Sequence, residues 1–421
     1  MPTVANETEE ALQRCNKCGF CLSACPIYKV TGIEWTVARG RIALIRSALL
    51  DHQLELDELK EPVGNCLTCN ACVDVCPAKV MTGDIIFKTR EEMLKQHGDS
   101  WMQRLAFQKV LADPSLIHKA TRLLRLADLS GLRALARKTG LTRLIGDAGK
   151  AETIVPKVPS SGGLEAIQKL ATKLDNPKHK VAYFVGCYAP SLAPEKAAAT
   201  IRILHKHKVE AIVPDFVCCG LPAAGYGDLT SAKNLAKQNI DLARKLDVDA
   251  IVTPCASCSS FLKDYGKLLA DEPEWSEKVK GFVDKVKDFS EFLVDIGLVT
   301  EMGTVKKKIT YHDPCHLSHH QKIKEPQRTI LKSIPGAEFV ELEEADACCG
   351  AAGSYAFKNY DLSMKVLDRK MNNVVKTGAD ILVSSCPACV MQLSSGVKQR
   401  KIPVDVLEIT EILDRAYRAE K

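Results

Sequence analysis

Cys218-Cys219-Gly220 contains two adjacent cysteines followed by glycine, and the same three residues recur as Cys348-Cys349-Gly350. Each pair lies inside a longer pattern, in which one cysteine precedes the pair and a Cys-x-x-Cys motif follows it. Corresponding cysteines of the two copies are 128 to 131 residues apart. Adjacent cysteines form strained disulfides, so their value lies in two thiolates held side by side. The pattern predicts a duplicated, metal-binding domain.

Each copy contributes five cysteines. They are Cys187, Cys218, Cys219, Cys255 and Cys258 in the first copy, and Cys315, Cys348, Cys349, Cys386 and Cys389 in the second. In both copies short apolar runs, such as 181–185 and 308–311, alternate with stretches of helical period. This alternation predicts parallel α/β units, in which ligands gather beyond the carboxyl ends of the strands. A helix is expected to begin after each Cys-x-x-Cys motif, with its positive end near an anionic cluster.

Two further motifs near the N-terminus have the spacing of bacterial two-cluster ferredoxins. They are Cys15-x2-Cys18-x2-Cys21-x3-Cys25-Pro26 and Cys66-x2-Cys69-x2-Cys72-x3-Cys76-Pro77. In such pairs three cysteines of one motif share a cubane cluster with the fourth cysteine of the other. This rule assigns Cys15, Cys18, Cys21 and Cys76 to one [4Fe-4S] cluster, and Cys66, Cys69, Cys72 and Cys25 to the other. Zinc knuckles would need only two Cys-x-x-Cys pairs.

A helix is predicted over residues 36–50, between the two ferredoxin motifs, because apolar residues recur there at helical spacing. Three arginines lie along it, Arg39, Arg41 and Arg46. They either offset the charge of the clusters or form a solvated basic face, and the sequence leaves both interpretations open.

These signals divide the 421 residues into four parts, in a multidomain α+β and α/β fold. Residues 1–95 form a helical two-cluster ferredoxin-type module, 96–179 a basic helical connection and linker, and 180–300 and 301–421 the two α/β domains. Residues 101–150 carry ten Lys or Arg among leucines. This is typical of a brace, or of a surface that docks on an anionic membrane or an acidic partner. Residues 156–163 are predicted to be a linker.

The 18 cysteines all belong to these patterns, which favours metal sites over disulfides in a reducing compartment. The N-terminus has no apolar signal stretch and no apolar run is long enough to span a membrane, so we expect a cytoplasmic protein. The formal charge of +6 falls to about +2 once two cubanes with their thiolates are counted. It therefore does not indicate nucleic-acid binding. Gly225 and Gly227 lack the spacing of a dinucleotide fingerprint.

The five-cysteine pattern resembles the CCG domain of the heterodisulfide reductase B/D family. A ferredoxin module followed by two such domains is similar to the iron-sulfur subunit of glycolate oxidase and bacterial lactate dehydrogenases, and the resemblance covers essentially the whole chain. It is carried by 312–317, 344–350 and 385–389 in the second copy, and by 186–187 and 218–222 in the first. The first copy also somewhat resembles a subunit of anaerobic glycerol-3-phosphate dehydrogenase. The resemblance implies a noncubane four-iron cluster at each five-cysteine set, with zinc an alternative at one of them.

The resemblance further implies an electron-transfer subunit of an FAD-dependent 2-hydroxyacid dehydrogenase that acts on glycolate or lactate. Its partners would be a flavoprotein subunit and a quinone or another carrier, with peripheral contact at the inner face of the cell membrane. The chain itself has no flavin or hydride site, and no catalytic residue is assigned. Two alternatives stay open: a subunit that reduces a thiol disulfide in a pocket between the CCG halves, and a zinc-holding scaffold beside a working ferredoxin.

The histidines near Cys315 are not interpreted as ligands. His316, His319 and His320 are expected to be exposed or to lie outside the metal site, and His312 and Asp313 to shape the turn before Pro314.

Overall fold

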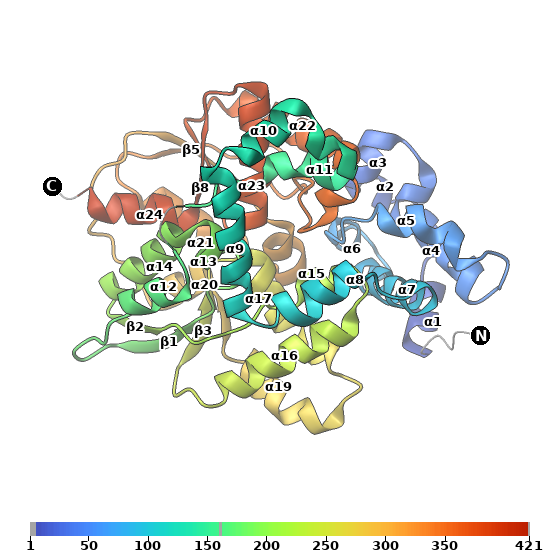
Figure 1. The fold of residues 1–421 in the computed structure, drawn as a ribbon, viewed down its shortest axis with the longest axis horizontal. Helices are drawn as coiled ribbons and strands as arrows, with labels where there is room; N and C mark the ends of the chain where they lie inside the picture. The colour runs from blue at the N-terminus through green and yellow to red at the C-terminus, as the bar shows by residue number, and fades with distance from the viewer. Residues whose placement is uncertain (1–5, 160–161, 420–421) are drawn as a thin grey trace.

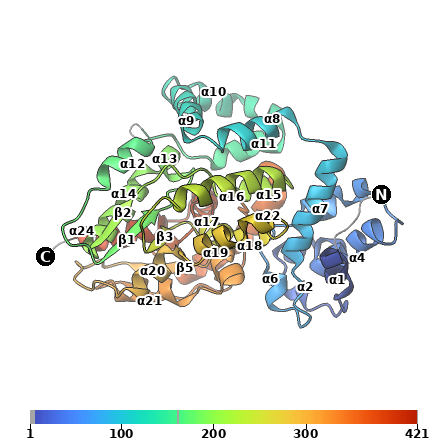
Figure 2. The ribbon, with the colours of Figure 1, turned by 90° about the horizontal axis from the view of Figure 1, so that it is seen from below.

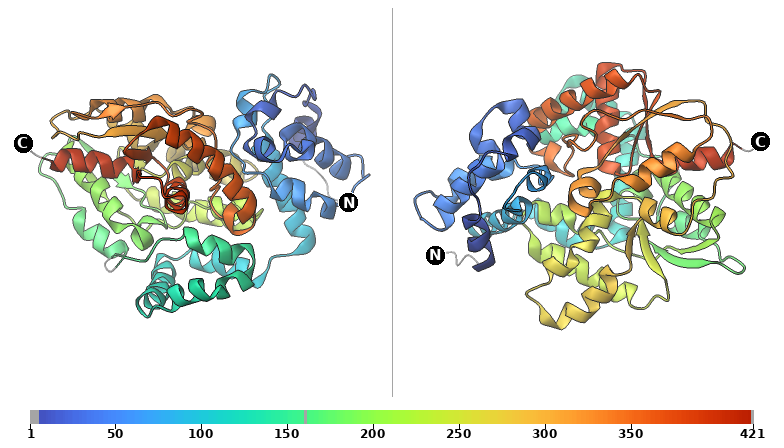
Figure 3. Two further views of the ribbon diagram at one scale, coloured as in Figure 1. Left: turned by 90° about the horizontal axis from the view of Figure 1, so that it is seen from above. Right: turned by 180° about the vertical axis from the view of Figure 1, so that it is seen from behind.

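The computed structural model describes residues 6–159 and 162–419 of the chain, which form helices and two small parallel sheets (Figure 1). Ser160 and Ser161 of the predicted linker lie outside the described residues. Figure 2 shows the N-terminal helical module at one end, the two α/β domains packed together, and helices α8 to α11 along one side. The N-terminus lies at the end of the helical module and the C-terminus at the far end of the α/β pair (Figure 3). The predicted fold class is confirmed.

The N-terminal module is built from short helices, and its described part contains no strand. Its helices are α1 (Asn6–Gln13), α2 (Cys21–Ala24), α3 (Pro26–Thr31), α4 (Ala38–Leu49), α5 (Lys60–Gly64), α6 (Ala71–Asp74) and α7 (Thr82–His97). Helix α4 is the one predicted between the ferredoxin motifs. It buries Ile42, Ile45 and Leu49 on one face, against Leu12 and Ile86 of α1 and α7. This packing holds the two cysteine loops in one body.

Each α/β domain contains a four-stranded parallel sheet, and the strand orders are β2-β1-β3-β4 and β6-β5-β7-β8. The strands are β1 (His179–Tyr183), β2 (Val209–Ile212), β3 (Ala250–Thr253), β4 (Val286–Asp288), β5 (Lys308–His312), β6 (Glu338–Phe339), β7 (Ile381–Ser384) and β8 (Asp405–Glu408). The identical order agrees with a duplication. Strands β4 and β8 were not predicted, because each is short and carries charged residues that lead into a capped helix.

The helices of the α/β domains cover both sheets. They are α13 (Ala189–Leu192), α14 (Pro194–Lys206), α15 (Leu221–Gly225), α16 (Leu229–Ala243), α17 (Ala256–Lys263), α18 (Tyr265–Leu268), α19 (Ser276–Val283), α20 (Phe289–Asp295), α21 (Glu325–Ser333), α22 (Tyr360–Thr377), α23 (Pro387–Arg400) and α24 (Ile409–Arg418). The two sheets share one apolar core, in which Val181 and Val252 join Ile309 and Val383. The two domains therefore form a single packed unit.

The expectation that a helix begins after each Cys-x-x-Cys motif is wrong. Helix α17 begins inside the first motif and α23 inside the second, with Cys255 and Cys386 as the extended residues that precede them. Residues three apart lie on one face of a helix. The early start therefore brings Cys258 and Cys389 round beside Cys255 and Cys386.

The connection between the module and the α/β domains consists of α8 (Trp101–Arg104), α9 (Pro114–Leu129), α10 (Leu132–Thr139), α11 (Asp147–Ala151) and α12 (Leu164–Leu170). Its inner side braces the α/β unit. Phe107 packs into the core of the first domain, and the Leu111 carbonyl accepts a hydrogen bond from the Cys218 backbone at 3.2 Å. Lys150 binds Asp361 of the second domain at 2.8 Å. The inner side of the connection therefore acts as the predicted brace. The leucine-rich outer side of the described connection does not contact the α/β domains in this way.

An ion-pair cluster fastens α3 of the N-terminal module to the second α/β domain. Glu344 contacts Lys29 at 2.9 Å and Arg369 at 2.8 Å. Burial alone would raise the pKa of Glu344, but hydrogen bonds from Lys29 and Arg369 outweigh it and lower this pKa to about 2. A lowered pKa means that the stabilisation is complete above the unfolded value, near 4.5, and is lost only as the pH falls from there towards about 2.

We expect Glu344→Gln to weaken this docking by ~1 kcal/mol, because the charge-assisted hydrogen bond from Lys29, which joins the module to the domain, is lost. Hydrogen exchange of the α3 amides should become faster, by a factor that stays the same at every pH from about 6 to 8. Glu343→Gln is the matched control, because Glu343 pairs with Lys376 on the exposed surface of its own domain. Equal exchange in both variants would show that the cluster does not hold the module.

Candidate iron-sulfur sites

Each predicted cubane set lines a small cavity of its own in the N-terminal module. Cys15, Cys18, Cys21 and Cys76 surround one of them. Cys25, Cys66, Cys69 and Cys72 surround the other. Cys72 borders both cavities, so the two sets are adjacent. The structure brings the cysteines together in the predicted sets, and their ligation of iron stays a prediction.

The three arginines near these sets differ in their surroundings. Arg46 is exposed and lies 3.7 Å from Asp51, and Arg39 pairs with Glu34. Arg41 is only 2% exposed, and its Nε donates to the Pro62 carbonyl at 2.7 Å while one terminal nitrogen has no partner. It lines the second cubane cavity beside Cys25 and Cys66. A buried cation with a free donor fits an anionic cluster there, whereas Arg46 belongs to the solvated face.

We expect Arg41→Met to lower the reduction potential of the cluster in the Cys25 set. One buried unit charge within several ångströms is worth ~2–3 kcal/mol at an effective dielectric near 20, which corresponds to ~100 mV for one electron. Redox titration followed by electron paramagnetic resonance (EPR) would measure the shift. Arg46→Met is the control and should leave the potential unchanged. A similar shift in both variants would mean that Arg41 has no special role.

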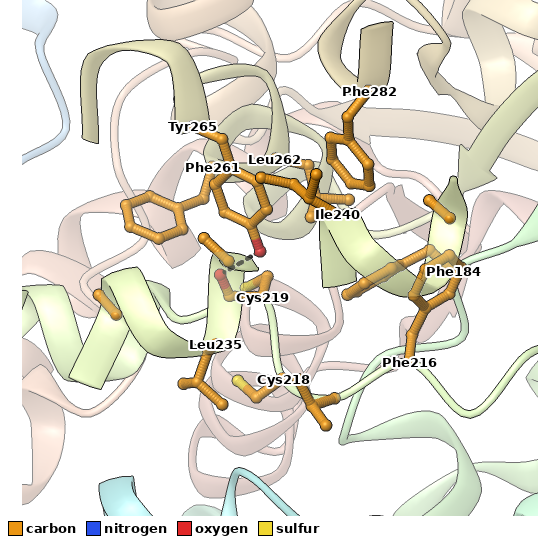
Figure 4. Packing of buried hydrophobic residues seen from close by; sticks show 14 of the residues in the cluster. Phe184, Phe216, Cys218, Cys219, Leu235, Ile240, Phe261, Leu262, Tyr265 and Phe282 are labelled. Atoms are coloured by element: carbon orange, nitrogen blue, oxygen red, sulfur yellow. Dashed lines mark hydrogen bonds between the residues drawn. The ribbon is translucent and has the colours of Figure 1, made fainter. Parts of the chain in front are cut away.

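The first cysteine pair lies buried in the core of its domain, between β2 and α15 (Figure 4). Phe184, Phe261 and Leu235 pack around it. The hydroxyl of Tyr265 donates to the carbonyl of Cys219 at 2.7 Å, which fixes the backbone of the pair. These apolar side chains cover the pair on the side of the domain core.

The glycine that follows each pair is required by the backbone. Gly220 and Gly350 have φ angles of 96° and 89°, a left-handed conformation that favours glycine. A Cβ atom at Gly350 would lie 2.6 Å from the Ser363 carbonyl oxygen in α22. The chain can therefore turn each pair towards the other cysteines only with glycine in this place.

The ten CCG cysteines form one continuous series across the interface of the two domains. In the first domain Cys187 neighbours Cys218, and Cys219 neighbours Cys258. The second domain repeats this with Cys315 beside Cys348 and Cys349 beside Cys389. The two halves meet where Cys255 neighbours Cys386, and Ser257 Oγ lies 3.3 Å from Cys386 Sγ. Because corresponding cysteines meet there, the series has approximate twofold symmetry.

The crowding of these thiols fits a metal-sulfur group. The neighbouring thiol and burial raise the pKa of Cys187 and of Cys315. Thiolates so close together repel one another unless a cation core neutralises them, and thiolate ligands suit iron-sulfur clusters and zinc. Five cysteines exceed the four that a zinc ion or a cubane uses. The donor set therefore fits a larger cluster at each copy.

The two copies differ in their access to solvent. A cavity of about 760 Å³ lies between the domains and the N-terminal module, and all five cysteines of the first copy line it. From the second copy only Cys386 reaches its wall, while Cys315, Cys348, Cys349 and Cys389 are buried elsewhere. The first site can therefore meet a small molecule, and the second is enclosed by protein.

The cavity wall is mainly apolar, with Phe87, Met93 and Met391 among its residues, and it also contains one ion pair. Lys196 and Glu408 lie 3.0 Å apart, one from each α/β domain. Burial raises the pKa of Glu408 to about 7, against the opposing charge of Lys196. This carboxyl group can therefore bind or release a proton near neutral pH.

The enclosed second site lies against the N-terminal module. Cys25 and Cys69 pack in one apolar cluster with Cys315 and Cys348. Burial raises the pKa of Cys69, and the nearby Cys348 and Cys315 raise it further. The second CCG set is thus the neighbour of the Cys25 cubane set.

His319 and His320, which we expected to be exposed or to lie outside the metal site, are enclosed and hold this junction together. His319 Nδ1 lies 2.7 Å from the Asp74 carboxylate, and His320 Nε2 lies 3.1 Å from the Thr68 carbonyl oxygen. The ring of His316 stacks on that of His320 at 4.5 Å. All three histidines lie in the helical turn that follows Cys315, and His319 and His320 contact the loop and helix around Cys69 and Cys72. Sequence spacing could not reveal this role, because the partners lie about 250 residues away.

Sequence reasoning also missed the position of His312. It lies at the end of β5, is fully buried, and its Nδ1 donates to the Ala345 carbonyl at 3.0 Å. It therefore shapes the loop before the second pair, but a ring nitrogen also lies within 4.8 Å of the sulfur atoms of Cys349 and Cys389. Asp313, its neighbour, binds Arg328 at 2.8 Å. The one sequence signal for a site residue here was that a histidine stands at the carboxyl end of an apolar strand, where ligands gather in parallel α/β domains.

A buried lysine lies beside the same site. Lys370 of α22 donates to the Ala345 carbonyl at 3.2 Å and is 3% exposed. Burial lowers its pKa to about 8, and the thiols of Cys349 and Cys348 act in the opposite direction. A cation so close to the second set would favour the reduced form of a cluster held there.

Comparison with known proteins agrees with this arrangement. The chain matches the 4Fe-4S dicluster domain over residues 11–80, the linker region of the glycolate oxidase iron-sulfur subunit over 98–155, and the cysteine-rich CCG domain over 181–263 and 309–394. It is 36% identical, over 95% of this chain and 93% of the relative, to a probable glycolate oxidase iron-sulfur subunit of Bacillus subtilis. Over 99% of this chain and 97% of the relative, it is 27% identical to the glycolate oxidase iron-sulfur subunit of Escherichia coli. A hypothetical protein from Helicobacter pylori shares the fold, with a TM-score of 0.58 and 14% identity over 100% of this chain and 74% of that protein.

Proposed function

The chain belongs to the glycolate oxidase iron-sulfur subunit family, and from that premise we propose that it relays electrons for an FAD-dependent glycolate or lactate dehydrogenase. A separate flavoprotein subunit would deliver the electrons, and a quinone or another carrier would receive them. The bound clusters supply one-electron redox steps, while the protein sets their spacing and potential. The observation that supports this proposal best is the linear order of the four cysteine sets.

The series of cysteine sets has two distinct ends. Cys18 of the first cubane set is exposed, and Phe20 close to it is 60% exposed, so this end is open to a protein partner. Cys72 joins the two cubane sets, Cys69 adjoins the second CCG set, and Cys386 adjoins the first CCG set. The series then ends at the cavity between the domains.

The cavity suits a small acceptor that takes up two electrons and protons. Its wall is mainly apolar, as the head group of a quinone requires, and the first CCG set lines it. Glu408 on the same wall can release a proton near neutral pH, with Lys196 holding the carboxylate that remains. A quinone that takes up two electrons must also take up two protons, so a titrating group beside it is useful.

The proposal is tested by anaerobic purification of the native complex, followed by addition of glycolate or lactate. We expect a flavoprotein to co-purify and either acid to bleach the iron-sulfur absorbance. No flavin, together with clusters that neither acid reduces, would contradict the proposal.

A second candidate function is reduction of a thiol disulfide at the first CCG set. The specific observation in its favour is the cavity, because all five thiol positions of that set face it and Cys386 joins them from the other half. The same anaerobic preparation separates the two functions. Reduced clusters that a thiol disulfide reoxidises, in a preparation without flavin, would favour this candidate.

We propose that the outer side of the connection rests on an anionic membrane surface. Leucines of α9 and α10 project outward there, and Leu123, Leu126 and Leu129 are 69%, 62% and 72% exposed. Arg122 beside them is exposed too, and within the described residues no carboxylate forms a salt bridge with it. Exposed leucines interleaved with cations are typical of helices that lie in a membrane interface. No helix of the described chain is long and apolar enough to cross a membrane.

We expect Leu123→Glu combined with Leu126→Glu to abolish co-sedimentation with vesicles that contain phosphatidylglycerol, because the apolar contact is lost and like charges repel. Leu170→Glu in α12 places a carboxylate at an exposed leucine outside this patch and should leave binding intact. A double variant that still binds vesicles but no longer binds the flavoprotein would identify the patch as a subunit interface instead.

A further inference from the structure

His312 differs from His207 and His319, the other buried histidines of the described chain. His207 has a partner at each ring nitrogen, the Ile203 carbonyl at 2.8 Å and the Val299 amide at 3.1 Å. Both ring nitrogens of His319 have partners as well. The Nε2 of His312 is buried without any hydrogen-bond partner. An enclosed polar atom of this kind needs a partner that the protein atoms do not supply.

The hydrogen bond at the other ring nitrogen fixes what Nε2 offers. A carbonyl oxygen can only accept, so Nδ1 carries the proton towards Ala345 and Nε2 presents a lone pair. A ring nitrogen held by a backbone carbonyl is the usual arrangement when the other nitrogen binds a metal. The sulfur atoms of Cys349 and Cys389 lie within 4.8 Å of the His312 ligand atom and of each other.

The first copy has no equivalent nitrogen. Phe184 precedes Cys187 by three residues, as His312 precedes Cys315, and the strand register gives the same correspondence. The Phe184 ring packs against Phe216 at 5.1 Å inside the apolar core beside Cys219. The two CCG sites are therefore alike in their thiols but differ in this one donor.

We propose that His312 Nε2 is a ligand of the metal group in the second CCG site, together with Cys349 and Cys389. The second site is then a mixed thiolate and imidazole site, whereas the first is bound by thiolates alone. The inference rests on the proposal that the second CCG set holds metal. Imidazole is neutral and thiolate is anionic, so a nitrogen ligand raises the reduction potential of an iron-sulfur group, as it does where histidine replaces cysteine. The site nearer the cubanes would thus have the higher potential of the two CCG sites.

The test compares the anaerobically purified wild-type chain with His312→Phe, which copies the residue of the first site. X-ray absorption at the iron and zinc edges should show a nitrogen neighbour of the metal in the wild type, at about 2.0–2.1 Å if the metal is zinc. That nitrogen signal should disappear in His312→Phe. If the group contains iron, pulsed EPR should lose the corresponding nitrogen coupling. The edge that changes identifies the metal.

Two further variants keep the test decisive. His316→Phe removes another histidine beside the site, whose Nδ1 lies 3.7 Å from Cys315 Sγ, and should leave the nitrogen signal intact. His312→Gly leaves room for free imidazole, and added imidazole should restore the signal if Nε2 is a ligand. The same metal content with an unchanged nitrogen signal in His312→Phe would overturn the inference.

Failure of the underlying proposal would look different. If Cys349→Ser had the same iron and zinc content as the wild type, the second site would hold no metal, and the proposal for that site would fail together with the inference. If Cys349→Ser lost metal but His312→Phe kept the nitrogen signal, only the inference about His312 would be wrong.

Discussion

Replacement of Cys349 by serine is expected to stop electron passage from the cubane sets through the second CCG set to the first. The variant should lose the second CCG group, about four iron atoms per chain if that group is a four-iron cluster. The other three cysteine sets keep all their thiols. The reason is the contacts between the sets. Cys69 adjoins Cys315 and Cys348, and Cys386 adjoins Cys255, so neighbouring thiols lead from the cubane sets to the first CCG set through the second. Cys66 of the second cubane set shares only the cavity wall with the first CCG set. EPR spectra taken after reduction by the flavoprotein and its substrate would show reduced cubanes and an oxidised first CCG site.

Cys219→Ser is the matched control, because it removes a group of the same size from the other end of the series. In that variant the second CCG site should still become reduced together with the cubanes. If the first CCG site of Cys349→Ser were reduced as fast as in the wild type, the series of cysteines would not be the path. Loss of cubane signals in Cys349→Ser would instead indicate a folding defect.

Cys219→Ser is also expected to separate two activities of the complex. Substrate-driven reduction of a soluble quinone should be lost almost completely, because the first CCG set lines the cavity with all five cysteines, whereas the other sets reach its wall only through Cys66 and Cys386. Reduction of a small artificial dye should continue, because such a dye can accept electrons at the exposed Cys18 end. The iron content should fall by about four atoms per chain, while the cubane signals persist.

The comparison of the two acceptors is the measurement that decides this prediction. Quinone reduction at the wild-type rate would mean that the acceptor binds outside the cavity. A Cys219→Ser spectrum identical to that of the wild type would refute the assignment of Cys219 as a ligand.

Much of the architecture could be predicted because it depends on local spacing. The ferredoxin motifs predicted the grouping of Cys25 with the Cys66 loop, since each loop supplies only three ligands to its own cavity. The two CCG pairs indicated the duplication. The glycine after each pair has a left-handed backbone conformation, which is a local requirement of the turn and is therefore visible in the sequence. The start of α17 at Ala256 was missed because the helix begins inside the motif, where the cysteines gave no capping signal.

The roles of His319 and Arg41 could not be predicted, because their partners are distant in sequence. His319 reaches Asp74 across 245 positions, and Arg41 donates to the carbonyl of Pro62, 21 positions further along the chain in α5. The brace formed by the connection depends in the same way on contacts such as Lys150 with Asp361. Such contacts exist only after the N-terminal module, the helical connection and the two α/β domains have packed together.

The cysteine sets, the duplicated α/β fold and the family resemblance could therefore be predicted, because they depend on ligand spacing and motifs along the chain. Three features depend on tertiary packing: Cys255 meets Cys386, the first site opens on a cavity while the second is enclosed, and His312 brings a ring nitrogen to thiols where the first copy has Phe184. Two nearly equal halves pack about an approximate twofold axis, while Cys25 and Cys69 of the N-terminal module pack against the cysteines of the second site alone. Their environments become different through that packing, which local spacing cannot encode.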